Sequence, residues 1–144
     1  MTEAQHQPDH PIPACGVDPI TSASIAASLG HALHTSSHPT DIAVVPLDQH
    51  FIGHGVLLFE NGSHYLDNIR QILAISLDYH ETPDVVVYSY REHDVLDEND
   101  IYEFDLTSAW FASQGIQLID WFVVTQRNAR SIPAEFGRSS NWTK

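Results

Sequence analysis

Basic residues are scarce in this sequence. Six Lys and Arg stand against 19 Asp and Glu in 144 residues, which gives a formal net charge of −13 at pH 7. Affinity for nucleic-acid backbones and for anionic lipid depends on clusters of Lys and Arg. We therefore expect neither non-specific nucleic-acid binding nor docking to a membrane. A protein partner with a basic surface fits this charge better.

Cysteines and long apolar runs are also scarce. The single cysteine, Cys15, excludes a disulfide within the chain and a cysteine-rich zinc cage. No stretch reaches the roughly 18 apolar residues of a membrane-spanning helix. The first residues lack the basic and apolar regions of a signal peptide. These features together predict a cytoplasmic protein.

What the sequence does contain suits one globular domain. Its length of 144 residues and its hydrophobic content of 42% allow a single buried core. Residues 1–19 are rich in Pro and His and predict a flexible arm. We expect the folded domain over 20–138 and a tail over 139–144. Trp142 in that tail either docks back onto the domain or marks a contact with a partner.

Hydrophobic periodicity predicts alternating helices and strands. Helices are expected over 22–35, 64–79 and 99–115. Strands are expected over 41–48, 51–60, 84–90 and 116–125, with a short edge strand over 130–136. Pro46 cannot donate a hydrogen bond to a neighbouring strand, so one side of its strand should be free there, or bulged. This order predicts an α/β domain whose mixed sheet is flanked by helices.

The helix over 99–115 has recognisable ends and a recognisable apolar side. Asn99 can cap its start, and Gly115 is well placed just after its end. Its buried side is expected to consist of Ile101, Phe104, Leu106, Trp110 and Phe111.

Three short segments resemble a known family when taken in order. These are Val45-Pro46-Leu47-Asp48 with Ile52-Gly53, the strand GIQLIDWFVV over 115–124, and SIPAEFG over 131–137. Their order and spacing over about residues 21–138 resemble the JAB/MPN domain of the RadC-like type. The resemblance implies a three-layer, cytidine-deaminase-like fold with a mixed sheet between helices.

The same resemblance implies a zinc site, and this sequence departs from it. Active members carry a His-x-His pair followed by an Asp ligand, and the zinc activates a water molecule. Here Tyr88 and Tyr90 stand at the His positions, and Asp100 alone matches the ligand set. A phenol is a poor zinc ligand at neutral pH. We therefore expect a catalytically inactive domain that needs no cofactor.

The acidic segment after Tyr90 is the expected interaction surface. Glu92, Asp94, Asp97 and Glu98 fall within ten residues and would attract a protein partner with a basic surface.

The alternative is a zinc-dependent hydrolase or isopeptidase of the JAB type with shifted ligands. In that interpretation His93, Asp97 and Asp100 bind the metal, and Glu92 or Asp41 acts as the general base.

Overall fold

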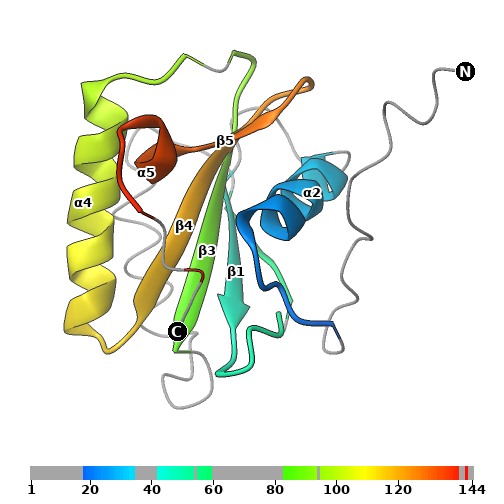
Figure 1. Ribbon diagram of the computed structural model, residues 1–144, viewed down its shortest axis with the longest axis vertical. Helices are drawn as coiled ribbons and strands as arrows, with labels where there is room; N and C mark the ends of the chain where they lie inside the picture. Colours follow the sequence, from blue (N-terminus) through cyan, green and yellow to red (C-terminus); the bar gives the residue numbers. More distant parts are fainter. Residues whose placement is uncertain are drawn as a thin grey trace, which may run out of the picture.

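The computed structural model describes residues 18–34, 42–53, 55–59, 83–93, 95–139 and 142. Within them lies one mixed five-stranded sheet in the order β2-β1-β3-β4-β5 (Figure 1). Its strands are β1 (Ile42–Leu47), β2 (Leu57–Phe59), β3 (Asp84–Tyr90), β4 (Gln117–Val124) and β5 (Ala129–Ser131). Strands β3 and β4 are parallel, and every other pair is antiparallel. The predicted α/β architecture with a mixed sheet is confirmed.

Strand β3 lies at the centre of the sheet and is buried along its whole length. Its run of three valines, Val85–Val87, suits a strand covered on both faces. It pairs with β4 from Asp84 to Tyr90, and the register shifts between Val85 and Val86, whose partners are Leu118 and Asp120. The shift leaves Ile119 as an extra residue in β4, which is a bulge.

Helix α2 (Ala23–His34) covers one face of the sheet. It begins as expected at Ser22, whose hydroxyl accepts a hydrogen bond from the Ile25 backbone N–H. The core on this face, called here the α2 core, includes Tyr88 and Tyr90 from β3 and Phe122 from β4. The rings of Tyr88 and Phe122 stack at 5.7 Å between centroids.

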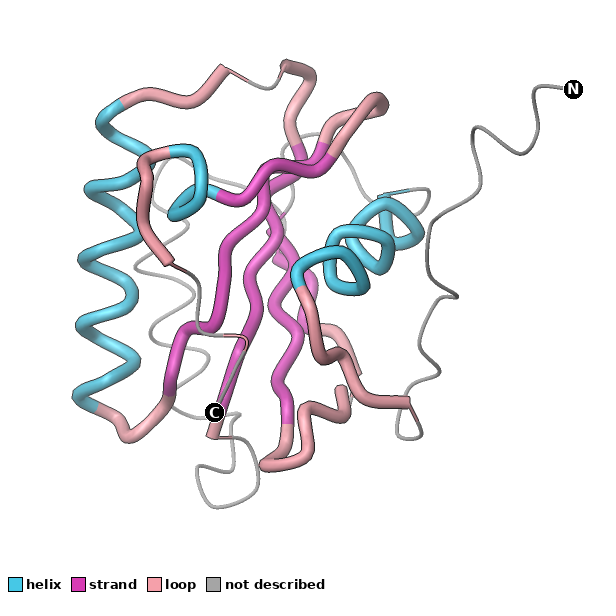
Figure 2. The backbone as a smooth tube through the Cα atoms, viewed as in Figure 1, coloured by secondary structure: helices cyan, strands magenta, loops and turns pink. Residues whose placement is uncertain are grey.

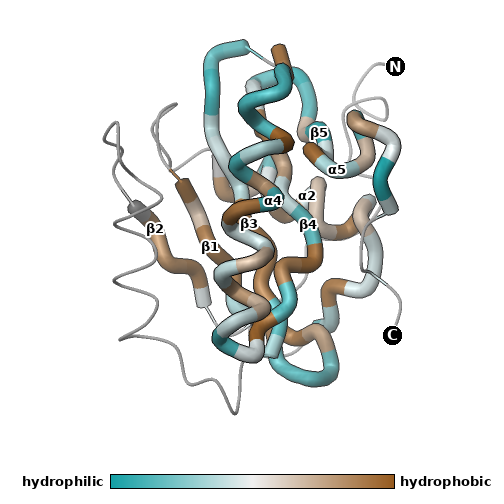
Figure 3. Tube along the Cα trace, turned by 90° about the vertical axis from the view of Figure 1, so that its left-hand side faces the viewer, coloured by the Kyte–Doolittle hydropathy of each residue, from teal (hydrophilic) through white to brown (hydrophobic). Residues whose placement is uncertain are grey.

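Helix α4 (Glu98–Ser113) covers the opposite face, and Figure 3 views the molecule from its side. Its N-cap is Asp97 rather than Asn99, because the Asp97 carboxylate accepts from the backbone N–H groups of Asn99 and Asp100. Gly115 follows the helix with a φ of 78°, which confirms the predicted glycine position. Leu106, expected in the core, is 41% exposed.

The hairpin expected over 41–60 is shorter than predicted. Ladder pairing between β1 and β2 involves only Ile42–Val44 and Leu57–Phe59. Upstream, Ile52 and Gly53 form single bridges to Pro19 and Leu47, and Gly55 has a φ of 113°. Pro46 lies beyond the last β2 partner, so its side toward β2 is free of ladder pairing, as expected.

The edge strand expected over 130–136 is only partly correct. Strand β5 ends at Ser131, and α5 (Ile132–Glu135) follows as a single helical turn (Figure 2). Ser131 caps this turn by accepting from the Ala134 N–H, and the proline near its start favours a helix beginning. The helix predicted over 64–79 and most of the arm lie outside the described residues. Within the described ranges, no helix is long and apolar enough to cross a membrane.

Gly30 is expected to be intolerant of a side chain. A Cβ there would lie 2.6 Å from Cε1 and 2.7 Å from Cδ1 of Tyr88. We expect Gly30→Ala to lower the free energy of unfolding by about 1–3 kcal/mol, despite the better helix propensity of alanine. Ser28→Ala on the same helix is the matched control and should be neutral or slightly stabilising. Urea unfolding of both variants measures this loss. Equal stability of the two variants would contradict the close approach of Gly30 to the Tyr88 ring.

Candidate functional site

Tyr88 and Tyr90 hold helix α2 against the sheet. Both side chains are buried. The Tyr88 hydroxyl donates to the Ala26 carbonyl oxygen at 2.7 Å, and the Tyr90 hydroxyl donates to the Gly30 carbonyl oxygen at 3.2 Å. These bonds satisfy the hydroxyls of two buried tyrosines. The two residues at the expected His positions therefore face α2.

Burial also governs the chemistry of the Tyr88 phenol. Loss of solvation raises its pKa well above the ordinary value of 10.0, and the proximity of Tyr90 and Asp120 adds to the effect. The phenol is consequently neutral at any physiological pH. A neutral phenol is a weak metal ligand, which agrees with the departure seen in the sequence.

Asp100 lies on α4 and is engaged in the start of that helix. Its carboxylate accepts from Arg91 Nη2 at 2.6 Å and from the Asp97 backbone N–H at 3.0 Å. With Asp97 as N-cap, this forms a reciprocal capping box. Phe104 and Phe111 of α4 pack in the core on the face opposite the tyrosines. Tyr88, Tyr90 and Asp100 thus do not converge on one pocket.

The shifted ligand set is not brought together either. His93 is exposed, and Asp97 and Asp100 are occupied by the capping box. Across the described part of the chain, no three His, Cys, Asp or Glu side chains are grouped so that they could hold a metal ion. Of the two alternative bases, Glu92 is exposed, and Asp41 lies outside the described residues.

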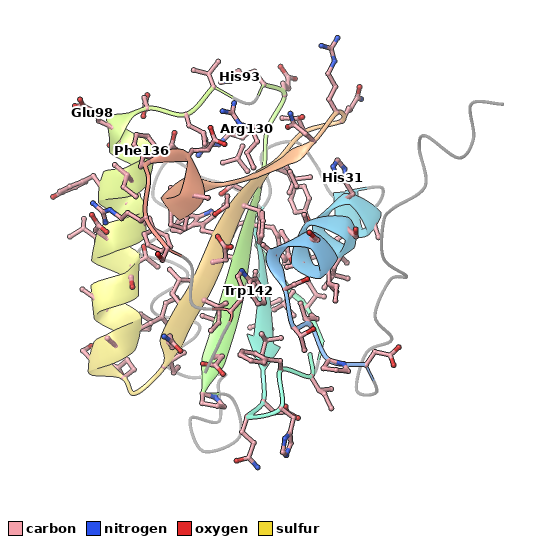
Figure 4. All side chains as sticks on the ribbon, viewed as in Figure 1. His31, His93, Glu98, Arg130, Phe136 and Trp142 are labelled. Carbon is pink, nitrogen blue, oxygen red and sulfur yellow. The ribbon has the colours of Figure 1, made fainter. Side chains whose placement is uncertain are left out.

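The acidic segment forms an exposed surface at the start of α4. Glu92, Asp97 and Glu98 are exposed, and Asp94 lies outside the described residues. Figure 4 places His93 and Glu98 at the same end of the molecule, along the loop that enters the helix. Asp100 is the exception, because it is buried beneath Arg91.

Exposed apolar side chains lie among these carboxylates. Val95 is 65% exposed, Tyr102 58% and Leu106 41%. Glu98, Tyr102 and Leu106 follow one another at intervals of four residues, so they share one face of α4. Six of the exposed side chains within residues 92–106 are called here the α4 surface, namely Glu92, Val95, Asp97, Glu98, Tyr102 and Leu106.

A second feature, which the sequence did not single out, is the buried carboxylate of Asp120. It lies in β4 with no exposed area. Oδ1 accepts from the Trp121 backbone N–H at 2.8 Å and from the Ser131 hydroxyl at 2.7 Å, and Oδ2 accepts from the Trp142 indole N–H at 2.8 Å. Trp142 belongs to the α2 core, so it docks back onto the domain.

The electrostatics of Asp120 reflect this burial. Desolvation raises the pKa of its carboxyl above the ordinary value, and the three hydrogen bonds oppose that rise. One signal in the sequence could have identified it, because an Asp interrupts the apolar run over 116–124. A charged residue inside a buried strand needs partners from elsewhere in the chain.

Comparison with known proteins finds no protein-family model and no curated protein that matches this sequence.

Proposed function

We propose that this domain is a non-catalytic binding module that recognises a protein partner with a basic surface through the α4 surface. One observation carries the proposal. Three of the five exposed large hydrophobic side chains among the described residues, Val95, Tyr102 and Leu106, lie within the same segment as exposed carboxylates. Exposed apolar side chains bordered by charged ones are typical of interaction sites.

The two kinds of side chain have separate tasks in such a site. Carboxylates of Glu92, Asp97 and Glu98 steer a basic partner and set its orientation, and their effect is screened over about 8–10 Å by salt. Tyr102 supplies an apolar ring with a polar tip, and an Arg side chain can stack on it. Burial of Tyr102 and Leu106 then provides affinity that persists when the charges are screened.

We further propose that the scaffold is JAB/MPN-like and lacks the metal site of the active members. Two residues within the resembling segments, Asp120 and Ser131, are hydrogen-bonded at 2.7 Å, which supports a common role for those segments. Tyr88 and Tyr90, at the positions of the His ligands, are directed to α2 carbonyls. A scaffold with those positions committed to packing acts by contact rather than by hydrolysis.

Neutralising the α4 surface is expected to weaken partner binding selectively. Peptides selected by display on the wild-type protein should be rich in Lys and Arg. For such a peptide, Glu92→Gln with Glu98→Gln should raise the Kd by about tenfold at low salt, which corresponds to about 1.4 kcal/mol. Raising the salt from about 50 to 300 mM should weaken wild-type binding and reduce the difference between the two proteins.

The matched control changes the net charge equally at a distance from α4. Gln117→Lys with Ala32→Lys adds two positive charges, as the double neutralisation removes two negative ones, and both positions are exposed. This control should bind nearly as well as the wild type. Equal losses in both variants would indicate a general charge effect, and selected peptides whose binding ignores salt would refute the proposal. Tyr102→Ser should weaken binding without altering stability.

A further inference from the structure

Trp142 is a buried residue, although most of the described residues that precede it after Pro133 are exposed. It is 8% exposed, whereas Ala134, Glu135 and residues 137–139 are all exposed. Figure 4 shows its indole lying over the sheet. Among the described residues after Phe136, Trp142 alone is buried.

The group that receives the indole is fixed independently of it. Oδ1 of Asp120 is held by the Ser131 hydroxyl and the Trp121 N–H, both from the sheet. Within the described residues, Oδ2 accepts from Trp142 alone. A buried carboxylate oxygen of this kind requires a donor. If Trp142 were absent, a preformed acceptor would remain in place.

Phe51, whose ring lies beside the Trp142 indole, has an unusual backbone conformation. Phe51 lies 6.3 Å from Trp142 between ring centroids. Its φ is 62°, in the left-handed region that bulky residues rarely adopt, and it is the one non-glycine residue with a positive φ in the described ranges. Such conformations persist where surrounding contacts enforce them, and they cluster at ligand clamps. Hydrogen bonds to Asp48 and Ile20 hold Phe51 in this position.

We propose that Asp120, Ser131 and Phe51 form a binding niche for a tryptophan-bearing peptide segment, and that the chain's own Trp142 is its reversible occupant. The niche contains the two elements that recognise an indole, an aromatic wall and one buried acceptor for the ring N–H. Both belong to the folded domain rather than to the tail. The Trp142 side chain can therefore leave and return without unfolding the sheet. This niche is separate from the α4 surface.

The full-length Trp142→Ala variant tests the niche with a defined probe. A labelled peptide of residues 139–144 should bind it saturably. It should bind the wild type at least about tenfold more weakly, because a tethered occupant competes at an effective concentration in the millimolar range. The same peptide with Ala in place of its Trp should not bind. Trp142→Ala combined with Asp120→Asn should also lose binding, since a carboxamide cannot accept hydrogen bonds at both ends.

Two results would contradict the proposal of a binding niche. One is the absence of peptide binding to a folded Trp142→Ala protein, and the other is equal binding of the Trp and Ala peptides. A Trp142→Phe variant keeps an aromatic ring, smaller than the indole, and removes the N–H, so it provides a milder version if the Ala variant does not fold. It should accept the peptide more weakly than the Ala variant and more strongly than the wild type.

The unmodified protein gives an independent measurement. The Trp121 indole N–H donates to Ser89 inside the core on the α4 side, so it serves as an internal reference. The Trp142 indole N–H should exchange with solvent deuterium at least about 100-fold faster than that of Trp121, because it needs only a local opening. It should still exchange more slowly than a free indole. Equal rates for Trp142 and Trp121 would show that the tail leaves only on unfolding, and exchange as fast as in free indole would show that it does not dock.

Discussion

A protein carrying both Tyr88→His and Tyr90→His is expected to lose about 4 kcal/mol of unfolding free energy and to gain no affinity for zinc. The loss follows from replacing two buried rings by smaller, polar imidazoles beneath α2. Zinc should not compensate, because both side chains face helix carbonyls while Asp100 is paired with Arg91 on the other side of the sheet.

The control for this experiment is Tyr88→Phe with Tyr90→Phe. It keeps both rings and removes only the hydroxyls, so it should lose about 1 kcal/mol per hydrogen bond. Thermal unfolding with and without zinc shows whether the His variant binds the metal. A zinc-dependent rise in Tm for the His variant, absent from the Phe variant, would show that these positions can still assemble a metal site.

Asp120→Asn is expected to destabilise the protein by about 2–3 kcal/mol near pH 7. The substitution keeps the shape of the side chain, but its amide group must face either the Trp142 indole N–H or the Trp121 N–H. A buried donor left without an acceptor costs about 1–3 kcal/mol. Asp105→Asn, at an exposed residue paired with Arg138, is the control and should change stability little.

The same pair of variants should reveal the pH dependence of Asp120. Because burial raises its pKa in the folded state, the folded protein binds this proton more tightly than the unfolded chain. The contribution of Asp120 to wild-type stability should therefore become more favourable as the pH falls from neutral through the raised pKa toward the ordinary value of 3.8. The slope for one proton cannot exceed about 1.4 kcal/mol per pH unit. Asp120→Asn lacks this contribution.

Urea unfolding between pH 7 and pH 4 measures the effect as a difference, so contributions from the other carboxylates largely cancel. The stability of the wild type relative to Asp120→Asn should grow as the solution becomes more acidic. A difference that shrinks toward low pH would mean that the hydrogen bonds outweigh desolvation, and that the pKa of Asp120 is lowered by folding.

Strong local patterns in the sequence were sufficient to predict the centre of the sheet. The valines of β3 and the apolar run of β4 identified both strands, and their bounds are 84–90 and 117–124. Helices α2 and α4 followed from periodicity, and the end of α4 also from Gly115. In these segments propensity and burial favour the same structure.

The remaining features depend on contacts between distant residues. Ile52 and Gly53 were assigned to one strand with Leu57, but the positive φ of Gly55 separates them. Leu106 fits an apolar helix pattern, yet its side chain is 41% exposed. Asp120 and Trp142 are 22 residues apart, and no local pattern links a carboxylate to its donor over that distance. The surface role of residues 92–100 remains a prediction.

The two ends of the sheet have a consequence for behaviour at high concentration. Among the described residues, strands β2 and β5 form its edges, and each contains three residues. An exposed edge is a template for pairing with another molecule, and its strength grows with the length of regular backbone that it offers. Edges this short offer few backbone groups for strand pairing between molecules. The net charge of −13 adds electrostatic repulsion between copies of the chain, so both features oppose aggregation.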